Sequence, residues 1–310
     1  KVKSVDGSGN VATSSENTFS TISIPVSSWS NNSLGVSGEY QSMAWNGSGY
    51  GVVYGWNGKL YFIKLSSTGS KVSETILATV PNYVQGTNII WNGSKFGVSW
   101  VQANPGNLRF ATINTNGEVL SDIAITVDND NTFSQRPSLI WDGSGYVLSW
   151  WGEHLLGGSV YFAKIASDGQ SFIISKKKAI TTAKAYGHDA VVSIYTNGQN
   201  FGVAWTDVRD SGDLNNRALY FSILDPNGNK VLDDIKISGA GRTNSPQVLS
   251  DGLNYSVFWT ESTADNVNAN SIYITKLDST GSKVLTNQSL GTKGDNEIRS
   301  SVVKADNNYG

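Results

Sequence analysis

The sequence predicts an all-β fold built from a repeated unit of four antiparallel strands, and two recurring signatures support this prediction. The first signature is a strand, an Asn-Gly or Asp-Gly turn, and a second strand that ends on an aromatic residue. Both positions of a two-residue hairpin turn need φ > 0, which glycine adopts freely. The clearest copy runs from Trp141 to Trp150, and its turn recurs at positions 46, 92, 142, 197, 251 and 306.

The second signature is an aromatic-rich strand followed by a glycine turn and a further strand with Val or Ile near its start. Its five copies begin at Leu60, Leu108, Val160, Leu219 and Ile272. Each unit therefore holds four strands, A to D, joined by the first turn between A and B and by the second between C and D. No segment shows the 3.6-residue apolar period of a helix.

Four antiparallel strands in repeats of roughly 40 to 50 residues are the sequence signature of a β-propeller, in which stacked blades bury one another's faces. The segment from Val5 to Val11 matches a C–D turn, and residues 298–310 match strand A and its turn. We therefore expect one domain, residues 1–310, forming a six-bladed propeller whose incomplete sixth blade is split between the N- and C-termini. The expected blades are 36–80, 84–128, 134–180, 187–238, 243–290, and 296–310 with 1–14.

The repeat Trp-(Asn/Asp)-Gly-x-x-(Tyr/Phe)-x-Val-x-Trp, followed by Tyr-Phe-x-x-Ile, resembles the repeats of bacterial secreted or cell-surface β-propellers over essentially the whole chain. It is not the WD40 pattern, and the Ser-x-Asp-x-Gly-x-Thr-Trp box of sialidases is absent. Many propellers of the kind that it resembles have no known activity. The resemblance implies binding at the loop face over the central channel.

Composition excludes several classes of function. The formal net charge of -2 and pI of about 5.7 argue against a nucleic-acid partner, which requires a dense basic surface. There is no cysteine, so disulfide, thiolate and zinc–cysteine chemistry are excluded. No apolar run approaches the roughly 20 residues of a membrane span. The abundant small polar residues and the start at Lys1 suggest a mature or excised segment of an extracellular or cell-surface protein, with room for further domains in the same polypeptide.

The B–C and D–A loops should share one face of the propeller and vary in length, and variable loops on a fixed scaffold usually carry function. Seven of the ten tryptophans follow the repeat and should form the core between blades. Trp29, Trp56 and Trp151 depart from the repeat and should lie on or beside the variable face. There they would offer aromatic platforms to a sugar ring or a protein partner, or would simply pack a loop down.

The two histidines of the chain lie in loops that should be neighbours on the ring. His154 follows Glu153 in the third blade, and His188 precedes Asp189 in the connection to the fourth. One hypothesis is a metal or acid–base site between these blades. The alternative is two surface histidines with unrelated neighbours.

The loop after Trp205 is the richest in charge. Asp207, Asp210 and Asp213 could offer oxygen ligands to calcium, although their spacing is not that of an EF-hand. The alternative is a surface loop held by an ion pair between Arg209 and an aspartate. Apart from calcium, the sequence indicates no cofactor.

The main functional prediction is a non-catalytic extracellular binding or adhesion module for a glycan or a surface protein. One alternative is a carbohydrate-active hydrolase or lyase at the central channel, which needs two carboxylates about 5 to 10 Å apart. Acids that could face the channel are Glu39, Asp189, Asp207, Glu261 and Glu297. The arginines that could bind an anionic sugar are Arg136, Arg209 and Arg299. A second alternative is a structural spacer within a larger surface protein.

Overall fold

The computed structural model describes residues 3–5, 11–13, 34–103, 106–126, 133–154, 157–181, 191–213, 216–238, 241–263, 266–293, 302, 304–305 and 308–309. The chain divides into two compact units, residues 1–33 and 34–310. In the first unit, β1 (Lys3–Val5) pairs antiparallel with β2 (Val11–Thr13). The second unit contains all the other strands.

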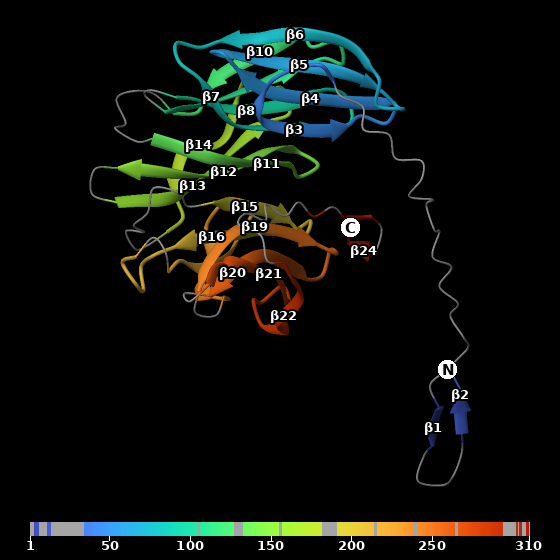
Figure 1. Cartoon of the computed structure of the whole chain (residues 1–310), viewed down its shortest axis with the longest axis vertical. Helices are drawn as coiled ribbons and strands as arrows, with labels where there is room; N and C mark the ends of the chain where they lie inside the picture. The colour runs from blue at the N-terminus through green and yellow to red at the C-terminus, as the bar shows by residue number, and fades with distance from the viewer. Residues whose placement is uncertain are drawn as a thin grey trace. The chain divides into compact units, whose positions relative to one another are not determined.

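The second unit is built from four-stranded antiparallel sheets, each with its strands in chain order (Figure 1). The first sheet contains β3 (Glu39–Trp45), β4 (Gly49–Trp56), β5 (Lys59–Ser66) and β6 (Lys71–Thr79). The second contains β7 (Val84–Trp91), β8 (Phe96–Gln102), β9 (Asn107–Ile113) and β10 (Val119–Ala124). The third contains β11 (Phe133–Trp141), β12 (Gly145–His154), β13 (Gly157–Ala166) and β14 (Phe172–Ala179).

The remaining strands continue the series. The fourth sheet contains β15 (Val192–Thr196), β16 (Phe201–Asp207), β17 (Ala218–Leu224) and β18 (Lys230–Lys236). The fifth contains β19 (Arg242–Ser250), β20 (Tyr255–Thr263), β21 (Asn266–Leu277) and β22 (Lys283–Lys293). A short hairpin follows, formed by β23 (Lys304–Ala305) and β24 (Asn308–Tyr309). Within the described part of the chain, no helix has the length and hydropathy needed to cross a membrane.

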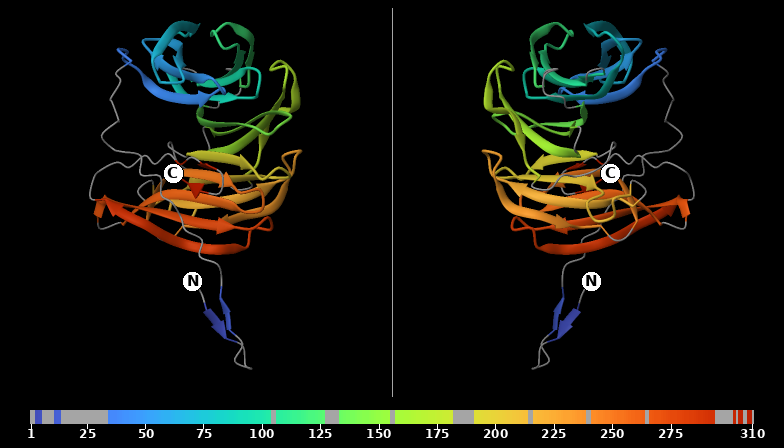
Figure 2. Two further views of the ribbon diagram at one scale, coloured as in Figure 1. Left: turned by 90° about the vertical axis from the view of Figure 1, so that its right-hand side faces the viewer. Right: turned by 90° about the vertical axis from the view of Figure 1, so that its left-hand side faces the viewer.

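Each sheet packs on the next one along the chain, and the first strands form the closest part of these contacts. Strand β7 contacts β3 on one side and β11 on the other, while β15 contacts β11 and β19. Figure 2 shows the same sheets from two further directions. The predicted all-β fold of four-stranded antiparallel blades is confirmed. Five such sheets are found among the described residues, so the predicted number of six blades is not confirmed.

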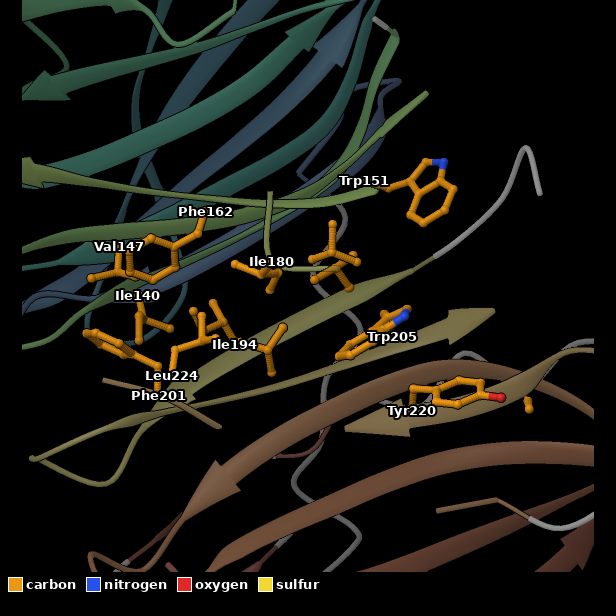
Figure 3. Packing of buried hydrophobic residues seen from close by; sticks show 14 residues of the cluster. Ile140, Val147, Trp151, Phe162, Ile180, Ile194, Phe201, Trp205, Tyr220 and Leu224 are labelled. Carbon is orange, nitrogen blue, oxygen red and sulfur yellow. The ribbon is translucent and has the colours of Figure 1, made fainter. Parts of the chain in front are cut away.

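A separate hydrophobic core fills each boundary between neighbouring blades. The strand-B tryptophans Trp100, Trp150, Trp205 and Trp259 are at most 1% exposed and each belongs to one of these cores. Figure 3 shows the core between the third and fourth blades, where Ile140 and Phe162 meet Ile194 and Phe201. The prediction that the repeated tryptophans form the inter-blade core is therefore confirmed for these four. Trp91 and Trp141 are only partly buried, and the prediction is wrong for Trp45, which is 46% exposed.

A polar contact also recurs between neighbouring A strands, and we call it the inter-blade clasp. In each clasp a side-chain oxygen of one blade accepts a hydrogen bond from a backbone N–H of the next. The clasps between described blades are Ile89 N to Ser42 Oγ (3.3 Å), Ile194 N to Ser138 Oγ (3.2 Å) and Val248 N to Ser193 Oγ (2.9 Å). Val302, which lies in no strand, donates its N–H to Gln247 Oε1 in the same way (2.7 Å). The clasp satisfies a backbone donor that the sheet itself leaves unpaired.

The A–B turns owe their shape to the Asn-Gly or Asp-Gly pair, but they are longer than the sequence predicted. In the third blade Trp141 pairs with Tyr146, which leaves four residues in the loop instead of two. Asp142 Oδ1 accepts hydrogen bonds from the backbone N–H groups of Ser144 (2.9 Å) and Gly145 (2.8 Å). Only the glycine, Gly143 at φ 93°, has a positive φ. The side-chain acceptor thus replaces the second left-handed residue of a two-residue turn.

Candidate functional site

The A strands of four blades carry a β-bulge near their first residues, at the end where the variable D–A connections arrive. In each of these blades the pairing register of strands A and B shifts at that point. The residue inside each bulge has a positive φ, and we call these four residues the inner rim. They are Tyr40 (53°), Gly86 (53°), Arg136 (43°) and Ser245 (51°).

Three of the inner-rim residues are strained, because a positive φ is uncommon for any residue other than glycine. Tyr40, Arg136 and Ser245 each adopt it at a cost of roughly 1 kcal/mol or more. Tyr40 is 39% exposed, and Arg136 is exposed as well. Arg136, predicted as a ligand-binding residue, therefore lies at a strained position with its side chain at the surface.

The bulges of the first three blades contact one another. The Thr87 hydroxyl donates a hydrogen bond to the backbone oxygen of Tyr40, and Asn88 Nδ2 donates one to the backbone oxygen of Pro137 at 2.6 Å. A Cβ added to Gly86 would lie 2.8 Å from Pro137 Cδ, so the close approach of the second and third bulges requires glycine. The inner rim is thus continuous from the first blade to the third.

The bulge of the fifth blade is held by the fourth blade. Thr243 Oγ1 donates a hydrogen bond of 2.7 Å to the backbone oxygen of Arg217, and Arg217 Nη1 reaches Asn244 Oδ1 at 3.5 Å. The Thr260 hydroxyl donates a hydrogen bond to the backbone oxygen of Asn244 at 3.2 Å. These contacts fix the backbone directly before Ser245 and so hold its unusual conformation.

Trp56 lies at the same end of the first blade as the inner rim. Strand register pairs Glu39 with Gly55, which brings the start of β3 next to the end of β4. A tight turn at Asn57 (φ 46°) and Gly58 (φ 69°) follows, and Trp56 is 46% exposed. Trp56 therefore presents an exposed aromatic face at the end of the first blade where the inner rim lies.

Trp151 is not on the surface as the sequence predicted. Its side chain is fully buried in the core between the third and fourth blades, near Trp205 (Figure 3). Strand β12 continues to His154, so Trp150 and Trp151 point to opposite sides of the sheet and enter different cores. A Cβ added to Gly158 would lie 2.1 Å from Trp151 Cζ2, so this glycine makes room for the indole.

The loop after Trp205 is organised by an arginine instead of a metal ion. Asp207 is 2% exposed. Its carboxylate accepts hydrogen bonds from Arg209 Nε at 2.6 Å and from Trp205 Nε1 at 3.3 Å. Arg209 also bonds Asp234 at 2.9 Å, and its guanidinium carbon lies 4.3 Å from the centroid of the Tyr220 ring. Burial opposes the charge of Arg209, but the hydrogen bonds with the two aspartates outweigh it and raise its pKa.

The other two aspartates of this loop have different partners. Asp210 accepts hydrogen bonds from Lys236 Nζ at 2.8 Å and from the Tyr220 hydroxyl at 2.6 Å, and these bonds lower its pKa. Asp213 is exposed, and its backbone N–H donates to Ser211 Oγ. Across the described residues no group of three or more acidic or histidine side chains is arranged to hold a metal ion. The predicted Arg209–Asp pair is therefore confirmed, whereas calcium binding by Asp207, Asp210 and Asp213 stays a prediction.

The fifth blade repeats part of this arrangement. Trp259 Nε1 donates to Glu261 Oε2 at 3.0 Å, so Glu261 takes the place that Asp207 has beside Trp205. In the third blade the equivalent position is Gly152, and Trp150 Nε1 is buried without a hydrogen-bond acceptor. In the fourth and fifth blades, therefore, a carboxylate at the end of strand B accepts the hydrogen bond of the core tryptophan.

Several predicted site residues lie outside the described residues. These are Trp29, His188 and Asp189, together with the acid Glu297 and the arginine Arg299. The backbone of His154 ends β12, but its side chain is not described. The proposed histidine site between the third and fourth blades thus stays a prediction.

Sequence reasoning missed Tyr40, Gly86 and Ser245. The four inner-rim positions share no residue type, and a bulge adds one residue without a recognisable motif. Only their position in the repeat could have identified them. Each inner-rim residue lies two positions before a polar residue at which the regular strand pairing resumes, and these polar residues are Ser42, Asn88, Ser138 and Gln247.

Comparison with known proteins supports the fold. No family model and no curated protein matches the chain. Among solved structures, the chain is similar to an α-L-arabinanase from Penicillium chrysogenum complexed with arabinobiose, with 9% identity, coverage of 76% of each chain and a TM-score of 0.53. Other similar structures are an endo-arabinase from Bacteroides thetaiotaomicron (14% identity, 71% of this chain and 84% of that one, TM-score 0.48) and a putative TolB from Agrobacterium tumefaciens (14%, 83% and 82%, 0.48). At these identities the likeness concerns the β-propeller fold alone.

Proposed function

We propose that this protein is a carbohydrate-active β-propeller that binds a polysaccharide across the inner rim. The observation that carries this proposal is the strained backbone of Tyr40, Arg136 and Ser245 at one end of three A strands. Strained residues concentrate at binding sites, and bulges redirect side chains toward ligands. The repeat itself does not require this conformation, because Val191 stands at the equivalent position of the fourth blade without a positive φ.

The chemistry of the rim suits a neutral sugar. The rings of Tyr40 and Trp56 offer apolar faces, and the guanidinium of Arg136 offers several N–H donors to hydroxyl oxygens. The Penicillium chrysogenum arabinanase, which shares the fold, was solved with arabinobiose. We therefore choose an arabinose-containing polysaccharide as the substrate class. The resemblance of the repeats to secreted propellers supports an extracellular or cell-surface location.

In its catalytic form, the proposal needs two carboxylates placed about 5 to 10 Å apart across the glycosidic bond. Glu39 directly precedes Tyr40 at the rim, and Glu261 pairs with Thr243 just before the fifth bulge. We propose these two glutamates as the acid pair. Asp207 is less suited, because the ion pair with Arg209 neutralises it.

The binding proposal is tested by titrating the protein with arabinan and arabinobiose, with a β-glucan as the unrelated polysaccharide. We expect Y40A and R136A to weaken arabinan binding by roughly tenfold or more, which corresponds to about 1.4 kcal/mol each. The matched control is R109A, because Arg109 lies on strand C and pairs with Asp122 at 2.8 Å, away from the A-strand bulges. Equal affinity of R136A and the unmodified protein would contradict the proposal.

A second candidate function, glycan or protein binding without catalysis, is favoured by a specific observation. Asp207 is engaged by Arg209 and Glu261 by the Trp259 indole, so both acids have structural roles. Release of reducing sugar from arabinan separates the two candidates. Activity that disappears in both E39Q and E261Q supports hydrolysis, whereas arabinan binding without release identifies an adhesion module.

A further inference from the structure

The last strand of every described blade contains a β-bulge next to the C–D turn. These D strands are β6, β10, β14, β18 and β22, and each lies at the end of its sheet. In each of them the pairing register with strand C shifts directly after the turn, so that one residue has no partner on strand C. That residue is a branched aliphatic in all five blades and is 50% to 64% exposed. The five bulge residues are Val72, Leu120, Ile173, Val231 and Val284.

The twist of the sheets does not explain these bulges. In the first four blades, strands B and C of the same sheets pair without any shift. Strand D differs from them in that its outer edge has no partner in the sheet. An unpaired edge exposes a row of backbone N–H and C=O groups with which another chain can pair, and a bulge interrupts that row.

In the second blade the edge has no unpaired charge to protect it. Strand β10 contains one charged residue, Asp122, and Arg109 of the same sheet pairs with it at 2.8 Å. Charged side chains are the common alternative to a bulge at a sheet edge. Next to the turn β10 instead carries Val119, which is 45% exposed, and Leu120, which is 50% exposed. Without its bulge, β10 would present a regular aliphatic edge of the kind that favours association.

A single residue produces the interruption in β10. Val119 and Ser121 pair with consecutive residues of β9, Ile113 and Thr112, and the pairing of the later residues is regular. Ser121 Oγ accepts the backbone N–H of Thr112 at 3.2 Å, so the bulge leaves this donor of strand C satisfied. Removal of Leu120 would therefore make the whole C–D pairing of this blade regular.

We propose that the D-strand bulges keep the outer edges of the blades from pairing with the same edges of a second copy of this protein. A second copy is the partner that fits, because two identical edges can pair antiparallel about a two-fold axis and bring the same aliphatic side chains together. The exposed aliphatic residues suit such a contact, whereas the bulge removes the continuous row of backbone groups that it requires. This inference goes beyond binding at the inner rim and does not depend on the ligand bound there.

Deletion of Leu120 tests the proposal, because it removes the bulge and leaves the other residue pairs of β10 in register. The unmodified protein, the variant lacking Leu120 and L120A are compared by size-exclusion chromatography with light scattering, at concentrations up to roughly 100 μM. L120A is the matched control, since it keeps the bulge and loses the aliphatic side chain. We expect the unmodified protein and L120A to stay monomeric, and the deletion variant to reach at least twice the monomer mass at the highest concentration.

Hydrogen exchange identifies the edge that pairs. In the deletion variant the amides of β10 should exchange more slowly as the concentration rises, while those of β12 should not change. A folded deletion variant that stays monomeric, or one that associates without protection of β10, would overturn the proposal. Loss of the near-ultraviolet circular dichroism of the deletion variant would also overturn it, because the bulge would then be needed for the packing of the blade itself. Association of the unmodified protein through β10 would equally contradict it.

Discussion

Two adjacent tryptophans on β12 are buried in different cores, because successive side chains of a strand point to opposite faces of the sheet. Trp150 enters the core between the second and third blades, and Trp151 enters the core between the third and fourth. The indole of Trp151 lies over Gly158, where any Cβ would be 2.1 Å from the ring. The glycine and the tryptophan therefore form one packing unit across β12 and β13.

This unit gives a prediction for stability. G158A should destabilise the protein by about 1–3 kcal/mol because the added methyl group overpacks the indole. W151A should cost about 3–5 kcal/mol because it leaves a cavity. In a W151L variant the G158A change should be much less costly, since the ring is gone. Urea unfolding at 25 °C measures these differences, and a G158A protein as stable as the unmodified one would show that the ring does not lie there.

At the scale of the element, the A–B turns differ in their first residue, which is Asp or Asn, and in the strand-C residue that lies next to it. In the third blade Asp142 Oδ2 binds Lys164 Nζ at 2.7 Å, and the side chains are 8% and 10% exposed. In the fifth blade Asp251 binds Lys276 at 3.3 Å. The turns of the second and fourth blades carry Asn instead, and Thr112 and Ile223 stand in the lysine position. The aspartate thus occurs together with a lysine of strand C.

The charge of Asp142 should make the stability of the third blade depend on pH. Burial opposes its charge, but hydrogen bonds from Lys164, Ser144 and Gly145 outweigh it and hold its pKa below the ordinary value of 3.8. A lowered folded pKa stabilises the protein above that ordinary value, and the contribution is lost as the pH falls through the folded pKa.

We therefore expect D142N to cost about 1–3 kcal/mol at pH 7, because it keeps the Oδ1 hydrogen bonds of the turn but leaves Lys164 without its carboxylate. As the pH falls below 3.8 and through the lowered pKa of Asp142, the difference between D142N and the unmodified protein should shrink and then disappear. Denaturant unfolding at several pH values measures it. D142A is the control that loses the turn hydrogen bonds as well, and a D142N difference that is constant with pH would contradict the ion-pair explanation.

At the scale of the whole molecule, stability is the sum of blades and of the boundaries between them, as in other repeat proteins. Each boundary between described blades has a hydrophobic core, and all but the one between the second and third blades also have an inter-blade clasp. Val302 makes a further contact of this kind with Gln247 beyond the fifth blade. A change at this contact should therefore affect the fifth blade first.

V302D gives a prediction at this scale, because it places a charge against Leu249 and Phe258. Hydrogen exchange should become faster in β19, while β11 and β12 keep their protection. V302I, which keeps an apolar side chain, is the matched control. Unchanged exchange in β19 of V302D would contradict this prediction.

The repeat architecture could be predicted from the sequence, but the candidate site could not. The Trp and Gly spacing predicts four-stranded blades because each copy fixes the same turn and the same core position. Trp151 was misplaced because the sequence does not show that β12 extends to His154. The inner rim was missed because positions as different as Tyr40 and Gly86 adopt one backbone conformation that neighbouring blades impose. Tertiary packing, not local preference, decides both cases.

The Asn-Gly turns also bear on how this protein ages. Asparagine followed by glycine deamidates readily, because glycine has no side chain to hinder attack of its backbone nitrogen on the asparagine side-chain carbonyl. Ammonia leaves, and water opens the resulting cyclic imide to isoaspartate or aspartate. In the first blade an aspartate formed from Asn46 would meet Lys64, which holds the strand position from which Lys164 binds Asp142. In the fourth blade Ile223 holds the position that lysine has in the first and third blades, and it is buried. An aspartate formed from Asn197 would therefore have no lysine partner. The aspartate product should therefore be tolerated better in the first blade than in the fourth.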